Sequence, residues 1–192
     1  MKNVLAASAA AIALIAAPLG AMAQTAGNTS DPAVIAALEA LSKYQQDEAT
    51  AAANLKTFDT LDFEVYSHQD WDRLGESHAE DILVHYPDGS TTTGLHDHIA
   101  ALSPMFVFAP DTRIEEHPVR IGSGEWTAVI GSLKGTFTEP MPIGEGKVIE
   151  PTGKAFTLGM ATIGRWNDKG VMAEEYLFWD NQDFMKQIGL AN

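Results

Sequence analysis

The sequence predicts an α+β fold, with helices in the first part of the chain and strands in the second. Apolar residues recur at helical spacing up to about residue 80. From residue 81 onward, short β-prone segments alternate with glycine- and proline-rich turn signals. The 192 residues, 45% of them hydrophobic, suit one packed domain with a short appendage. Helices followed by antiparallel strands favour a curved sheet wrapped over helices, and such a sheet would enclose an apolar cavity.

Residues 1–23 have the three-part pattern of a secretory signal peptide. Lys2 supplies the positive start, residues 4–17 form an uncharged apolar run, and Ala21 and Ala23 are the small residues before a cleavage site. A membrane anchor is the alternative, but the run is shorter than the roughly 20 residues of a bilayer span. We therefore expect cleavage after Ala23, a periplasmic or secreted mature protein, and no membrane association after cleavage.

Residues 24–53 are expected to form a linker and a helical extension. Asp31 followed by Pro32 is a helix-start pattern, with a capping side chain before a proline at the first helical position. Residues 45–53 are rich in alanine and charge, which favours an extension outside the main core. The folded domain is then expected to cover residues 54–192.

Within this domain, a helical stripe begins at Leu55 and a short helix is expected around Trp71. A strand over residues 82–86 ends at a Pro-Asp-Gly turn, and a helix is expected between Gly94 and Pro110. The remaining pattern is β, with strands expected over 113–121, 126–138, 154–166 and 171–180, a loop over 139–153, and a short last helix ending at Gly189.

Charge and cysteine content exclude several classes of function. Twelve Lys and Arg against 26 Asp and Glu give a net charge of −14. Such a field repels phosphate backbones, so we expect no nucleic-acid partner. The chain has no cysteine, which excludes disulfides, thiolate nucleophiles and zinc–thiolate or iron–sulfur centres.

Five short motifs then occur in a characteristic order. The motifs are His85–Gly89 with Gly94, Gly135–Thr138, Pro151–Lys154, Glu174–Asp180 and Gln187–Leu190. Together they resemble the SnoaL-like polyketide cyclases (ester cyclases) of the nuclear transport factor 2-like superfamily, over about residues 54–190.

The resemblance implies a cone-shaped fold in which a curved antiparallel sheet wraps around helices, here with an extra N-terminal helix. It also implies a homodimer formed through the convex face. The chemistry it implies is an intramolecular aldol ring closure that uses no cofactor and no metal, with an aspartate at the place of Asp180 as acid and base. A non-catalytic carrier of small molecules, or a dimerisation scaffold of the same fold, is the alternative.

Strand alternation places Asp180, Phe178, Tyr176 and Glu174 on one face. If this face lines the cavity, the aromatic rings could hold a small apolar or aromatic carbonyl compound beside the Asp180 carboxylate. The alternatives are an N-terminal helix cap for Asp180, a solvated charge for Glu174, and ordinary core packing for Tyr176 and Phe178.

Three further residues are candidates for the site. His85 could donate a hydrogen bond to a substrate carbonyl or pair with Asp180 as a proton relay, or it could be a histidine satisfied by the backbone. Phe106 and Trp126 are expected to contribute to substrate binding, with sheet core or interface as the alternative for Trp126.

His96 and His98 suggest a metal site, because imidazole is a common metal ligand. On a helix, however, residues two apart point to different sides and cannot bind one ion together. His78 or His117 would have to supply a further ligand, and no spacing marks either of them. We therefore expect no metal, and the resemblance implies no other cofactor.

Overall fold

The computed structural model describes residues 31–192. The chain divides into two compact units, which are Met1–Leu41 and Ser42–Asn192. The predicted signal peptide over residues 1–23 and the first residues of the predicted linker lie outside the described residues. The whole of the predicted domain over residues 54–192 lies within the second unit.

One long helix, α1 (Pro32–Thr60), replaces the two helical segments expected from the sequence. Its first turn is capped by Asp31, whose Oδ1 accepts a hydrogen bond from the Ala33 amide at 2.8 Å. The alanine-rich stretch in its middle does not interrupt the helix, because alanine has the highest helix propensity. Of the helices between residues 31 and 192, none combines the length and hydropathy of a membrane span.

Two short helical turns follow α1 and lead to the first strand. They are a π-helical turn, η2 (Leu61–Tyr66), and a 3₁₀ turn, η3 (Trp71–Glu76). The remaining helices are α2 (Leu95–Phe108) and α3 (Asn181–Gln187), which match the helices expected after Gly94 and before Gly189.

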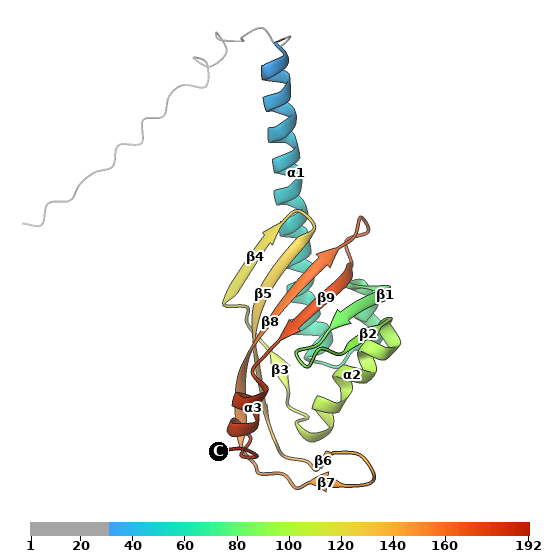
Figure 1. Cartoon of the computed structure of the whole chain (residues 1–192), viewed down its shortest axis with the longest axis vertical. Coiled ribbons are helices and arrows are strands. Elements are labelled where there is room, and N and C mark those ends of the chain that lie inside the picture. The colour runs from blue at the N-terminus through green and yellow to red at the C-terminus, as the bar shows by residue number, and fades with distance from the viewer. Residues whose placement is uncertain (1–30) are drawn as a thin grey trace, which may run out of the picture. The chain divides into compact units, whose positions relative to one another are not determined.

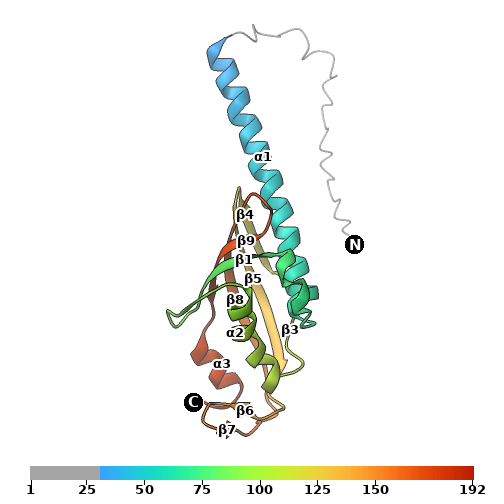
Figure 2. The same ribbon diagram turned by 90° about the vertical axis from the view of Figure 1, so that its right-hand side faces the viewer.

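Seven strands form a curved sheet, which stays open rather than closing into a barrel (Figures 1 and 2). Its order is β2-β1-β9-β8-β5-β3, with β4 also paired to β5. All neighbours are antiparallel except β1 and β9, which run parallel. The bounds are β1 His78–His85, β2 Thr91–Thr93, β3 Arg113–Ile114, β4 Val119–Ser123, β5 Trp126–Thr136, β8 Ala155–Trp166 and β9 Met172–Phe178.

The two faces of this sheet differ in what they contact. Inner-face side chains such as Val129 and Leu177 are buried against Phe58 and Val65 of α1 and η2. Outer-face side chains, among them Ile163, remain exposed. The core therefore lies on the inner side, where the helices cover the sheet.

Two segments differ from the sequence expectation. The strand expected over residues 113–121 is split into β3 and β4, with Pro118, which has no amide hydrogen for a strand ladder, between them. The loop over residues 139–153 carries a small hairpin of β6 (Met141–Pro142) and β7 (Val148–Ile149).

Gly135 in β5 lets Phe156 pack closely, since a Cβ there would lie 2.6 Å from the Phe156 ring.

Candidate functional site

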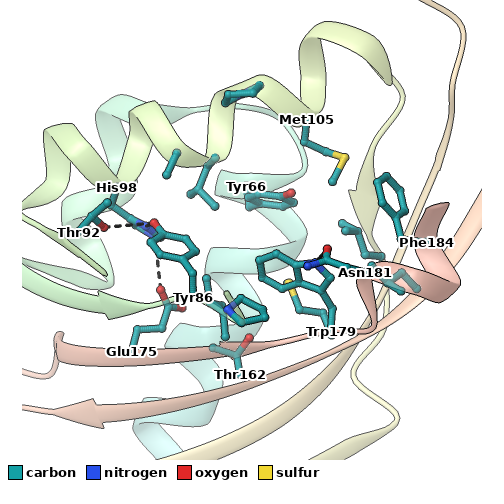
Figure 3. Close-up of a pocket in the computed structure, with 18 of the residues that line it drawn as sticks. Tyr66, Tyr86, Thr92, His98, Met105, Thr162, Glu175, Trp179, Asn181 and Phe184 are labelled. Atoms are coloured by element: carbon teal, nitrogen blue, oxygen red, sulfur yellow. Dashed lines mark hydrogen bonds and ion pairs between the residues drawn. The ribbon is translucent and has the colours of Figure 1, made fainter. Parts of the chain in front are cut away.

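A cavity of about 530 Å³ lies between the inner face of the sheet and the helices (Figure 3). The exposed residues Asp88, Ser90 and Asn181 belong to its lining, so the cavity opens to solvent there. Its volume suits a small organic molecule. The lining is mostly apolar and includes Leu61, Leu74, Leu102, Met105, Phe108, Leu133, Leu158, Met160, Leu177, Trp179 and Phe184.

Two imidazoles and a carboxylate form a polar part of this wall, which we call the His–Glu cluster: His78, His98 and Glu175. They come from the start of β1, from α2 and from the inner face of β9. Glu175 Oε2 lies 3.4 Å from His98 Nε2 and 3.7 Å from His78 Nε2. No side chain of the cluster is more than 5% exposed, so its charges are largely withdrawn from water.

Hydrogen bonds on the far side of each ring fix both imidazoles. His78 Nδ1 lies 2.9 Å from Ser77 Oγ, and the Ser77 hydroxyl also lies 3.1 Å from the Leu74 carbonyl. His98 Nδ1 lies 3.0 Å from the hydroxyl of Tyr86 (Figure 3). Each ring therefore turns its Nε2 atom toward Glu175.

Burial and neighbouring charge set the protonation of this cluster. Burial lowers the pKa of His98 to about 4, so this imidazole is neutral near pH 7. Burial by itself raises the pKa of Glu175, but the adjoining His78 and His98 outweigh it, and the pKa lies below its usual value of 4.5. Glu175 is consequently a buried carboxylate, ionised at neutral pH.

A second polar group, Asp62, lines the same cavity from the π-helical turn η2. Its Oδ2 accepts a hydrogen bond of 2.7 Å from His117 Nε2, while His117 Nδ1 lies 2.8 Å from Asp59 Oδ1. Arg120 pairs with Asp59 Oδ2 at 2.8 Å and is 40% exposed. A chain of polar contacts thus runs from the cavity wall to the surface.

Along this series of polar contacts, the pKa values of Asp62 and His117 are both raised. Burial raises the pKa of Asp62, although the hydrogen bond to His117 and its charge oppose the rise. Burial lowers the pKa of His117, but its hydrogen bonds with Asp62 and Asp59 and their charges prevail, so the pKa is raised. His117 can therefore hold a proton between two carboxylates while Asp62 faces the cavity.

Asp180 does not line this cavity, so the prediction that its face of β9 does so is wrong. The side chain is exposed, and Oδ1 accepts a hydrogen bond of 2.9 Å from the Asp183 amide. The alternative, an N-terminal cap for α3, is confirmed. The helices pack on the face that carries Glu175 and Leu177, which turns the Asp180 face outward.

Glu174, Tyr176 and His85 share that outer face, so the prediction that they line the cavity is also wrong. Glu174 Oε1 accepts a hydrogen bond from the Tyr176 hydroxyl at 2.7 Å and lies 3.1 Å from His85 Nε2. The His85 and Tyr176 rings stack with centroids 4.2 Å apart. Arg165 donates to Glu174 Oε2 at 3.1 Å, so the four side chains form a network on the outer face.

The remaining aromatic candidates also lie outside the cavity lining. Phe178 and Trp126 are 50% and 39% exposed on the outer face. Phe106 is buried, but it packs edge-on against the Tyr66 and Trp71 rings within the core. The predictions that these three side chains line the cavity are corrected accordingly.

Sequence reasoning missed Asp62 and Glu175, although each carried a signal. Glu175 is the one acid on an otherwise apolar face of its strand, and Asp62 follows Leu61 within an apolar helical stripe. The expectation that His96 and His98 point apart is confirmed, since the His96 side chain is 96% exposed and that of His98 is 3% exposed. Nothing in the spacing indicated that His98 meets His78.

Comparisons with solved structures agree on the fold. A candidate SnoaL-like polyketide cyclase from Jannaschia sp. CCS1 superposes with a TM-score of 0.63 at 20% identity, covering 74% of this chain and 95% of that one. A candidate polyketide cyclase from Xanthomonas campestris pv. campestris gives a TM-score of 0.62 at 15% identity, covering 73% and 99% of the two chains. IdmH, a candidate polyketide cyclase from Streptomyces antibioticus, gives 0.60 at 22% identity, covering 71% and 98%.

Among the curated proteins, no match is found. The family model of the SnoaL-like polyketide cyclases matches residues 58–188, which span η2, the cavity-lining strands and α3. The resemblance and the nuclear transport factor 2-like fold expected from the sequence are both confirmed. This chain belongs to the SnoaL-like polyketide cyclase family.

Proposed function

We propose that the protein binds a small, largely apolar carbonyl compound in its cavity and catalyses proton transfer on it, as in an intramolecular aldol ring closure. The observation that carries this proposal is Asp62, a buried carboxylate that lines an apolar cavity and is held by His117. Membership of the SnoaL-like family and the likeness to candidate polyketide cyclases support a reaction of this kind.

Asp62 is proposed to carry the proton. Its carboxylate removes a proton from the carbon next to the carbonyl, and the resulting enolate attacks a second carbonyl of the same molecule. The new alkoxide takes the proton back, so the reaction consumes none. A pKa raised by burial brings Asp62 closer to the range in which a carboxyl exchanges protons at neutral pH.

His117 and the His–Glu cluster have complementary roles in this proposal. His117, anchored by Asp59, orients Asp62 in the manner of a catalytic base held by a third group. The cluster gives the cavity wall a polar patch, while the apolar lining holds the ligand.

Exchange of carbon-bound protons for deuterium tests the proposal without knowledge of the natural substrate. 2-Tetralone, a flat aromatic ketone small enough for the cavity, is incubated with protein in D₂O and followed by proton NMR. Asp62→Asn keeps the shape of the side chain and is expected to lower the protein-dependent exchange rate by at least about 100-fold.

Asp180→Asn is the matched control, because it makes the same chemical change at the exposed cap of α3. It is expected to leave the exchange rate within about twofold of the wild type, far from the change expected for a catalytic acid or base. Full exchange by Asp62→Asn would refute the role of Asp62. Binding of the ketone without any protein-dependent exchange would favour the carrier function instead.

A further inference from the structure

The His–Glu cluster has a geometry that the proton-transfer proposal leaves unexplained. Hydrogen-bonded nitrogen and oxygen atoms lie about 2.7–3.2 Å apart, whereas Glu175 Oε2 lies 3.4 Å from His98 Nε2 and 3.7 Å from His78 Nε2. Within the described part of the chain, His78 Nε2 and Glu175 Oε2 are buried and have no hydrogen-bond partner. Buried polar atoms of this kind are uncommon in folded proteins.

The hydrogen bonds around His78 indicate which of its ring nitrogens donates a proton. The Ser77 hydroxyl has one proton, which is directed to the Leu74 carbonyl at 3.1 Å, so Ser77 Oγ accepts from His78 Nδ1. With Nδ1 directed at Ser77, His78 Nε2 points at Glu175 Oε2 across 3.7 Å, and within the described residues neither of these buried atoms has a hydrogen-bond partner. A cation between them would give both atoms a partner.

We propose that His78, His98 and Glu175 bind a divalent transition-metal ion, Zn²⁺ or Fe²⁺, at the cavity wall. Two imidazoles and one carboxylate are a common ligand set for these ions. Zinc–ligand bonds of about 2.0–2.1 Å place tetrahedral ligands about 3.3 Å apart, close to the shorter distance seen here. The three ligating atoms lie within 4.8 Å of one another.

The surroundings also suit a metal ion. A ligating histidine usually donates its other N–H to a fixed acceptor, and the contacts of Nδ1 with Ser77 and Tyr86 provide this for both rings. All three ligands line the cavity, so the remaining coordination positions face the space that a ligand would occupy.

This inference departs from the expectation of no metal, which considered a site on His96 and His98 with His78 or His117 as a further ligand. The structure instead joins His98 to His78 and Glu175, three residues that lie far apart in the sequence. The role of the ion, polarising the carbonyl oxygen of the bound compound, rests on the proposed function. The binding of the ion does not, and it can be measured without any substrate.

Metal binding is tested with the full mature chain, purified without an affinity tag and stripped with EDTA. Titration with Zn²⁺ in a calorimeter is expected to give one equivalent per chain and a higher melting temperature. Loading with Co²⁺ in place of Zn²⁺ is expected to give the visible absorption bands of a tetrahedral site. Binding of fewer than about 0.1 equivalents of Zn²⁺ per chain, where one site predicts one equivalent, would overturn the proposal.

Variants distinguish the cluster from adventitious surface binding. His98→Gln and Glu175→Gln are expected to weaken Zn²⁺ binding by at least about 100-fold, since even residues that only support a ligand contribute 10–100-fold. His96→Gln removes a neighbouring exposed histidine and is expected to bind as the wild type does. Equal losses in His96→Gln and His98→Gln would place the ion on the surface and overturn the assignment.

Ser77→Ala keeps all three ligands and is expected to weaken binding by about 10–100-fold, which keeps the test valid if a ligand variant fails to fold. Asp62→Asn separates the two proposals, because it is expected to lose proton exchange but to retain one equivalent of Zn²⁺. Loss of exchange in Asp62→Asn with no metal bound by the wild type would overturn the metal site alone.

Discussion

The contact between His117 and Asp62 allows a quantitative prediction about stability. His117→Leu removes the imidazole while filling much of its space against the Phe58 and Phe63 rings. The Asp62 side chain is only 9% exposed, so its carboxylate would be left buried without a partner. Breaking a buried ion pair from one side costs about 3–5 kcal/mol.

Urea unfolding, followed by tryptophan fluorescence, measures this cost. With an m-value of about 1–3 kcal/mol per molar urea, a loss of this size lowers the unfolding midpoint by at least about 1 M. The double variant His117→Leu/Asp62→Leu removes both partners and is expected to recover most of the loss, because an apolar pair in their place is close to neutral.

An exposed ion pair provides the control for this measurement. Lys43 and Asp47 form a pair whose side chains are 75% and 43% exposed, and Lys43→Ala is expected to cost about 0.3–0.5 kcal/mol. A loss below about 1 kcal/mol for His117→Leu, or a double variant no more stable than the single one, would refute the view of Asp62 as a buried, paired carboxylate.

Four further predictions concern pH, capping, assembly and export. The pKa values of Asp62 and His117 are raised in the folded state, so folding favours their protonated forms. The stability of the wild type relative to the double variant is therefore greatest below the ordinary pKa values of 3.8 and 6.5, and it falls as the pH rises through the raised values. Melting temperatures measured across this pH range test the prediction. Asp180→Ala is expected to cost about 1 kcal/mol in urea unfolding through loss of the α3 cap, and an unchanged midpoint would contradict that role. We expect a homodimer formed through the outer face of the sheet, where Ile163 is exposed, so Ile163→Glu should convert dimer to monomer in light scattering, and a wild-type monomer would refute this. Mass spectrometry of the exported protein is expected to give a chain that begins at Gln24, and an intact N-terminus would rule out cleavage.

Much of the fold could be predicted from the sequence because many of its signals are local. Helical spacing, the Pro-Asp-Gly turn and alternating strands identified α2, β5, β8 and β9 close to their observed bounds. The parallel pairing of β1 with β9 was not predicted, because pairing joins segments about 90 residues apart and leaves no local pattern.

The site was harder to predict. Strand alternation correctly divided β9 into a face with Asp180 and Glu174 and a face with Glu175 and Leu177. It could not decide which face is inward, because that depends on where the helices pack. The side chains of α1 and η2 cover the Glu175 face, and this reversed the predicted site.

The sequence by itself determined the family and most of the order of helices and strands, and it left capping and catalysis open as alternatives for Asp180. Only the tertiary structure decided which acids line the cavity and which histidines meet them. His78, His98 and Glu175 lie on three different elements, and their approach follows from the pairing of β1 with β9 and the packing of α2. Contacts of this kind depend on the whole folded chain, since no local spacing encodes the distance between residues that meet only when the sheet is assembled.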